Sequence, residues 1–166
     1  MADKCKGITA HAGKAFIMQR QLAANKIIVA GLQETFSKQQ SAIASVGDYM
    51  RIIPPAKSPD GSEGPEGDVE IWINNKIPCD PTNKDTTIKE HHLQVVDRGP
   101  KFFILNVTTP WLSIDLLCGH APQTWGDDAD KRAIAFWGAV ATAIHKRKHS
   151  PSQVPMMLLI DANNDI

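Results

Sequence analysis

Three short apolar runs, each followed at once by a polar cluster, constrain this chain more than any other feature. The runs and their clusters are Ile27–Leu32 with Gln33-Glu34-Thr35, Ile114–Cys118 with His120-Ala121-Pro122, and Met156–Ile160 with Asp161-Ala162-Asn163. An apolar run this short suits a strand that is buried on both faces. Because strand ends of a layered α/β fold converge on one rim, we expect the three clusters to lie together there.

Size and composition fit one ordinary globular domain. The chain has 166 residues, enough for a single domain over 1–166 with one core. Its 18 basic residues balance 18 acidic ones, so net charge gives no electrostatic argument for a nucleic-acid partner. A local basic patch on a neutral protein can still bind phosphates.

The cysteines and the N-terminal residues indicate which cellular compartment to expect. Cys5, Cys79 and Cys118 form neither a disulfide framework nor a CxxC metal motif, which favours a reducing compartment. Met1–Lys6 is not followed by the apolar region of a signal peptide, and no apolar run approaches about 18 residues. We therefore expect an intracellular protein, nuclear or cytoplasmic, with no membrane partner.

Hydrophobic periodicity predicts a layered α/β fold of the α+β type, with helices outside the sheets. The predicted helices cover 14–25, 38–44 and 127–148. The predicted strands cover 27–32, 69–74, 91–96, 101–108, 114–118 and 156–160, with a loop rich in Pro and Gly over 53–67. The short turns between the strands from 91 to 118 predict an antiparallel meander.

The last helix is the clearest of these elements. Asp127 is placed to cap it, and the basic residues at its end complement the helix dipole. Its predicted apolar stripe consists of Ile134, Trp137, Val140, Ala141 and Ile144.

Glu34, Asp161 and Asn163 each have a chemical interpretation and a simpler one. Glu34 after a buried strand is placed to bind a divalent cation, or it only marks where solvent exposure begins. Asp161 and Asn163, two residues apart, share one side of an extended segment and could flank a phosphate. Asp and Asn are also favoured turn formers, which explains the same residues without any function.

His120 and Trp125 complete the candidates. His120 could shuttle a proton or donate to a phosphate, although a lone histidine is more often structural. Trp125, in the loop after His120, is the best placed of the four tryptophans to stack on a base. The other three tryptophans, at 72, 111 and 137, are expected in the core. The pair His91-His92 and the basic run His145–His149 are weaker candidates.

Taken in order, these motifs resemble the endonuclease/exonuclease/phosphatase superfamily, from about Lys14 to Asn163. The series is a strand ending in Gln-Glu-Thr, a Pro/Gly loop, the strand Gly-Asp-Val-Glu-Ile-Trp-Ile, the motif Gly-His-Ala-Pro, a helix, and Leu-Leu-Ile-Asp-Ala-Asn. Within the superfamily the chain is most similar to the endonuclease domains of non-LTR retrotransposons.

The resemblance implies a fold, a reaction and roles for four residues. The fold would be a four-layer sandwich of two mixed sheets flanked by helices. The reaction would be phosphodiester hydrolysis that depends on Mg²⁺, or Mn²⁺ in its place, with DNA as the expected substrate. Glu34 would bind the metal, Asp161 would position or activate water, and Asn163 and His120 would contact the phosphate.

The chain also departs from the family at both ends. Ile8–His11 stands where the family's first strand carries an active-site asparagine, and it offers none. The chain ends at Ile166, before the family's closing Ser-Asp-His motif, so we expect a fragment that lacks the C-terminal part of the domain. Two alternatives therefore stay open: a phosphoesterase acting on inositol phosphates or sphingomyelin, and a catalytically dead remnant.

Overall fold

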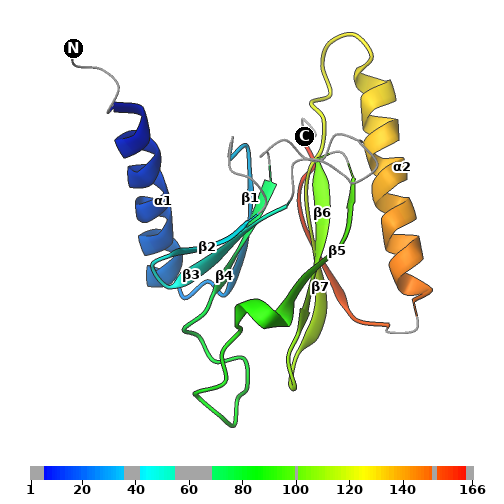
Figure 1. The fold of residues 1–166 in the computed structure, drawn as a ribbon. Coiled ribbons are helices and arrows are strands. Elements are labelled where there is room, and N and C mark those ends of the chain that lie inside the picture. The colour runs from blue at the N-terminus through cyan, green and yellow to red at the C-terminus, as the bar shows by residue number, and fades with distance from the viewer. Residues whose placement is uncertain (1–5, 36–41, 55–68, 100, 151–152, 164–166) are drawn as a thin grey trace.

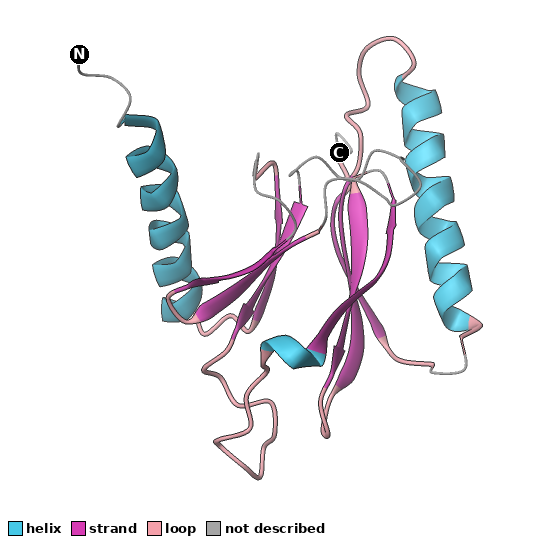
Figure 2. Cartoon of the chain, viewed as in Figure 1, coloured by secondary structure: helices cyan, strands magenta, loops and turns pink. Residues whose placement is uncertain are grey.

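The computed structural model describes residues 6–35, 42–54, 69–99, 101–150 and 153–163. The elements in this part are α1 (Lys6–Ala24), β1 (Val29–Gln33), β2 (Ala42–Val46), β3 (Tyr49–Ile53), β4 (Val69–Asn74), the 3₁₀ helix η1 (Glu90–His92), β5 (Leu93–Gly99), β6 (Phe102–Thr108), β7 (Ser113–His120), α2 (Ala129–Lys148) and β8 (Met156–Asp161). Two four-stranded sheets lie between two long helices, as Figures 1 and 2 show. This architecture confirms the predicted fold class.

The first sheet has the strand order β1-β4-β3-β2, and its neighbouring strands are antiparallel. β2 and β3 form a hairpin around Gly47-Asp48, where Gly47 takes a φ of 57°. The predicted helix over 38–44 is wrong where the structure describes it, because Ala42–Val46 is a strand; residues 38–41 lie outside the described part. The two-residue Gly-Asp turn was the sequence signal for this hairpin.

The second sheet has the order β5-β6-β7-β8 and is mixed. β5, β6 and β7 form the predicted antiparallel meander, and β8 lies parallel to β7 after the crossover through α2. The predicted strand over 91–96 begins later than expected, since His91 and His92 belong to η1.

The main core fills the space between the two sheets. Ile71 and Ile73 of β4 pack in one buried cluster with Phe103, Leu105 and Cys118 of the second sheet. The alternation of each strand places these side chains on the inner faces. Burying two facing apolar sheets in this way supplies the main driving force for folding.

A second cluster joins α2 to the outer face of the second sheet. Phe136, Val140 and Ala143 pack with Phe102 and Leu117. The predicted apolar stripe is therefore only partly right: Val140 is buried and Ile144 packs at the edge of the cluster, but Ile134 is 73% exposed. The predicted cap is wrong too, because Asp128 occupies the N-cap position and makes no side-chain cap hydrogen bond.

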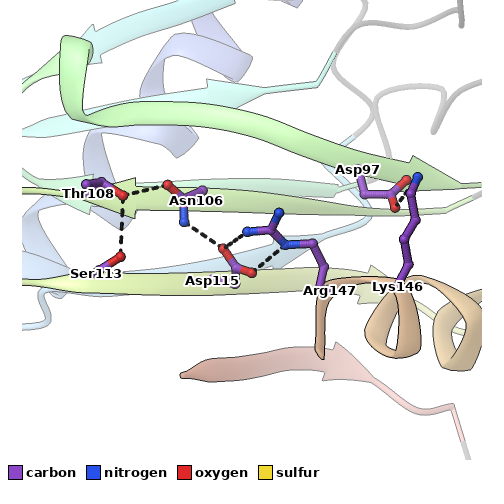
Figure 3. Close-up of polar contacts among 7 residues, drawn as sticks. All are labelled: Asp97, Asn106, Thr108, Ser113, Asp115, Lys146 and Arg147. Carbon is purple, nitrogen blue, oxygen red and sulfur yellow. Dashed lines mark hydrogen bonds and ion pairs between the residues drawn. The ribbon is translucent and has the colours of Figure 1, made fainter. Parts of the chain in front are cut away.

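Polar contacts hold the C-terminal end of α2 on the same sheet (Figure 3). Arg147 donates from Nε and Nη2 to the buried carboxylate of Asp115, at 2.7 and 3.1 Å. Asn106 donates to the same carboxylate at 2.8 Å. Lys146 reaches Asp97 of β5 at 3.3 Å. The buried carboxylate is thus both paired and hydrogen-bonded, as a buried charge requires.

α1 contacts the first sheet mainly through its C-terminal half. Gln19 is buried over the Gly47 turn, while Phe16 and Ile17 are 57% and 58% exposed. The helix begins earlier than predicted and includes Ile8–His11, so this segment is not the strand with which the family opens. Among the described residues no helix is long and apolar enough to cross a membrane.

Of the three tryptophans predicted to lie in the core, one is buried and two are exposed. Trp72 is buried, as expected, and donates from Nε1 to Glu70. Trp111 is 63% exposed and Trp137 is 38% exposed, so their prediction as core residues is wrong. Both lie where no second layer of side chains covers them in the described part of the chain: Trp111 in the β6–β7 turn and Trp137 on a flank of α2.

Candidate functional site

The ends of β1, β7 and β8 meet at one rim of the sandwich, as their order in the sequence predicts. β7 and β8 are parallel, and His120 stands in register with Asp161 at their last positions. β1 belongs to the other sheet but lies against β7 and β8, and it ends at Gln33. Glu34, which directly follows β1, therefore lies at the same rim as His120 and Asp161.

Glu34 and His120 face each other across the two sheets. Glu34 Oε1 lies 3.9 Å from His120 Nε2, a separation for an ion pair rather than a hydrogen bond. The Glu34 side chain is 59% exposed and that of His120 only 9% exposed. The Glu34 carboxylate is thus accessible to solvent, while the His120 imidazole is buried.

His120 has an unusual environment for a buried imidazole. Its Nδ1 atom is buried and has no hydrogen-bond partner among the described residues. Its backbone N–H donates to the carbonyl of Lys101, which fixes the residue at the end of β7. Buried polar atoms in native proteins are nearly always paired, so this nitrogen is an exception among the described residues.

Glu70, a carboxylate on β4 of the first sheet, does not orient this imidazole. Its carboxylate accepts hydrogen bonds from Arg51 and Trp72 on the outer face of the first sheet. The pairing with Glu70 raises the pKa of Arg51, so this guanidinium stays charged. Glu66 and Asp68, which precede β4 in the sequence, lie outside the described residues.

Asp161 and Asn163 meet at a turn rather than along an extended segment. β8 ends at Asp161, and Asn163 takes a left-handed φ of 47°. The Asp161 carboxylate accepts the backbone N–H of Asn163, and the Asn163 amide donates back to the carbonyl of Ala121. The turn interpretation is therefore correct about the geometry, and the turn itself brings Asn163 beside the residue that follows His120.

Trp125 stands apart from the other four candidates. It is 67% exposed, in the loop between β7 and α2 that rises beyond the rim in Figure 1. Its carbonyl accepts a hydrogen bond from Arg132 of α2, which holds the loop to the start of that helix. The indole is thus presented to solvent from an anchored loop, and no described contact joins it to Glu34 or His120.

Gln33 and Gly31 determine how closely the two sheets approach at this rim. Gln33 Nε2 donates to the carbonyl of Leu159 at 3.2 Å and lies 3.9 Å from the Cys118 sulfur. A Cβ atom at Gly31 would stand 2.7 Å from Leu159 Cβ and 3.1 Å from the same sulfur. Burial raises the pKa of the Cys118 thiol to about 12, so this group is an inert packing residue.

Sequence reasoning missed Lys101 as a residue of the rim, and it expected Gln33 there without assigning it a role. Gln33 belonged to the first polar cluster, but an amide that bridges two sheets leaves no pattern in the sequence. Lys101 follows the Arg98-Gly99-Pro100 turn, which was expected only to connect two strands. The antiparallel register of β6 against β7 puts this exposed lysine at the rim, because Phe102 pairs with Gly119.

The weaker candidates lie at the opposite end of the sandwich. His91 and His92 precede β5 there, and burial is the main cause that lowers the pKa of His92. The run His145–His149 ends α2 beside Asp115, at the start of β7. Neither group contributes to the rim.

The described residues contain no group of three or more His, Cys, Asp or Glu side chains arranged to hold a metal ion. Comparison with protein-family models, with curated proteins and with solved structures finds no match for this chain.

Proposed function

We propose that the rim formed by Glu34, His120, Asp161 and Asn163 hydrolyses phosphodiesters, with DNA as the substrate and Mg²⁺ or Mn²⁺ as the cofactor. The observation that carries the proposal is the approach of Glu34 to His120 across the two sheets, with Asp161 in register beside His120. Residues 34, 120 and 161 are far apart in the sequence and lie at the ends of three different strands, β1, β7 and β8.

The donor set suits a weakly held hard cation. Mg²⁺ usually keeps several waters and takes only one or two carboxylates from the protein, the rest coming from substrate phosphate. Among the described residues, Glu34 and the exposed Asp161 are carboxylates at this rim. The cation, when bound, would supply positive charge to a phosphate that becomes more negative in the transition state.

The protein's own groups can position the phosphate and move a proton. His120, buried on all but one side, presents Nε2 towards Glu34 and can donate to a phosphate oxygen or take a proton from water. One amide hydrogen of Asn163 is used by Ala121, and the second is left to donate to a phosphate. Exposed Lys101 adds a cation, and exposed Trp125 an aromatic face for an unpaired base.

A plasmid-nicking assay tests the proposal. We expect the purified chain to nick supercoiled DNA with Mg²⁺ or Mn²⁺ and not with EDTA. Glu34→Gln should lower the rate at least about a hundredfold, because loss of a cation ligand removes several kcal/mol of transition-state stabilisation. Glu90→Gln changes another exposed glutamate, at the far end of the sandwich, and should leave the rate unchanged.

The alternatives predict different results in the same experiment. Release of phosphate from an inositol polyphosphate, or of phosphocholine from sphingomyelin, without nicking would replace the nuclease proposal by a phosphoesterase. Folded protein that turns over none of these substrates would favour the catalytically dead remnant.

A further inference from the structure

The C-terminal end of α2 carries two histidines that the proposed function does not use. His145 and His149 are both exposed and lie four residues apart. The N–H of His149 donates to the carbonyl of His145 at 3.2 Å, so the helical spacing extends to the second histidine. Residues four apart on a helix are neighbours on its surface. The two rings accordingly lie close together, with centroids 4.3 Å apart and planes tilted by 57°.

The distance between the two rings fits a shared metal ion. An ion about 2.1 Å from one nitrogen of each ring, in both ring planes, lies about 3.2 Å from each ring centre. With the centroids 4.3 Å apart, the two nitrogens then subtend an angle of about 85° at the ion. Neighbouring ligands of square-planar and octahedral ions stand at right angles, whereas those of tetrahedral Zn²⁺ are further apart. The pair therefore suits Ni²⁺ or Cu²⁺.

The helix end that carries the pair is anchored, and most of its positive charge is offset. Three cations separate the two histidines in the sequence. Lys146 is paired with Asp97 of β5 at 3.3 Å (Figure 3). Arg147 is paired with the buried carboxylate of Asp115 at 2.7 Å. The negative end of the helix dipole also lies here and favours a bound cation. A metal ion at this point therefore meets little net repulsion.

We propose that His145 and His149 together bind one Ni²⁺ or Cu²⁺ ion, through one ring nitrogen each. Water would fill the other positions, since no third His, Cys, Asp or Glu joins the pair among the described residues. Imidazole is a good ligand for these ions, and two histidines four apart on one helix face are a known way to hold a metal.

This site is separate from the rim. Arg147, between the two histidines, contacts Asp115 near the start of β7, whereas His120 ends that strand. The rim offers mainly oxygen donors, which suit Mg²⁺ or Mn²⁺, and the helix end offers only nitrogen donors. The inference therefore stands whether or not the rim is catalytic.

Metal binding at this pair should also stabilise the end of α2. An unfolded chain does not hold the two imidazoles at this spacing, so the ion binds the folded helix preferentially. We expect Ni²⁺ to slow hydrogen exchange in the last turn of α2 in the parent chain and not in His149→Ala. Slowing of the same size in both proteins would overturn the proposal.

Calorimetric titration of the whole chain with NiCl₂, without a histidine tag, tests the site directly. We expect one Ni²⁺ per chain in a slightly alkaline buffer, where free imidazoles are neutral. His145→Ala and His149→Ala should each weaken binding at least about tenfold, because either change removes the second, intramolecular contact. The double variant should bind hardly more weakly than the single variants, since each of these has already lost the chelate.

A matched control comes from the other end of the second sheet's first strand. His91 is an exposed histidine whose ring centroid lies 4.1 Å from that of His92, but the two are adjacent in the sequence. His91→Ala should leave the affinity for Ni²⁺ unchanged. A parent chain that binds no Ni²⁺ at millimolar metal would overturn the proposal. Equal losses in His91→Ala and His149→Ala, or losses that add up in the double variant of His145 and His149, would overturn it too.

Discussion

The two long helices of this protein have nearly the same length, 19 and 20 residues, but they are held to their sheets very differently. α2 buries Phe136, Val140 and Ala143 against the second sheet and is fixed further by the ion pair of Arg147 with Asp115. α1 leaves Phe16 and Ile17 exposed and, over the residues whose burial is described, buries only Gln19.

The difference lies in the sheet faces that the helices meet. The outer face of the second sheet presents Phe102, Ile104 and Leu117, so an apolar helix stripe has a matching surface. The outer face of the first sheet carries the ion pair of Glu70 with Arg51 beside the buried rings of Tyr49 and Trp72. α2 therefore meets a mainly apolar part of its sheet, whereas the sheet beside α1 carries a buried ion pair among aromatic rings.

The largest effect should come from truncating a buried helix residue. Phe136→Ala removes a ring that packs edge-on against Phe102 and should cost about 3–5 kcal/mol of unfolding free energy. Phe16→Ala makes the same change on α1 and should cost less than about 0.5 kcal/mol. Urea unfolding followed by circular dichroism measures both. Equal losses would mean that α1 is packed as firmly as α2.

Two carboxylates test the two ion pairs. Asp115→Asn leaves the largely buried Arg147 without its charge partner and should cost about 3 kcal/mol, with faster hydrogen exchange through α2. Glu70→Gln should cost a similar unfolding free energy. Because Arg51 and Glu70 both lie in the first sheet, hydrogen exchange in the two helices should not rise more than in the rest of the chain. Faster exchange confined to α1 in Glu70→Gln would contradict this distinction.

Gly47 is the contact on which α1 rests. Its φ of 57° disfavours any side chain, and a Cβ there would stand 2.8 Å from the Gln19 side chain. Gly47→Ala should therefore cost about 1–2 kcal/mol and increase proteolysis within α1. Limited trypsin digestion compares the cleavage of α1 with that of α2, which should stay protected in this variant.

The smallest effect should be a gain in stability. Gly138 lies inside α2 with open space around it, so an added methyl group meets nothing. Gly138→Ala should raise the unfolding free energy by about 0.5–1 kcal/mol, because alanine loses less backbone entropy in a helix. A loss of stability instead would show that α2 lies closer to a neighbouring surface than the structure places it.

The sequence predicted those parts of the fold whose patterns are local. The strand at 69–74 is present as predicted, and the strands at 101–108 and 156–160 and the helix at 127–148 are present with boundaries shifted by at most two residues. The hairpin of β2 and β3 was missed because its apolar residues gave no strict alternation, and only the Gly47-Asp48 turn marked it. Local patterns fix the type of an element more reliably than the face it buries, as exposed Ile134 shows.

The rim was partly predictable for a related reason. Strand-end position identified Glu34, His120 and Asp161, since each follows an apolar run. It could not show that Asn163 reaches Ala121 through a left-handed turn, or that Gln33 bridges the sheets, because both depend on backbone angles and on contacts between distant residues. Trp125 remains a prediction, since its exposure allows stacking and does not demonstrate it.

Gly31 controls how closely the two sheets approach each other near the rim. At Gly31, β1 lies so close to the second sheet that a Cβ atom would approach Leu159 Cβ to 2.7 Å and Cys118 Sγ to 3.1 Å. Any larger residue there would act as a wedge close to Glu34, and the 3.9 Å interval between the carboxylate and the imidazole would widen. The distance between the Glu34 carboxylate and the His120 imidazole therefore depends on a glycine three residues before Glu34 in the sequence.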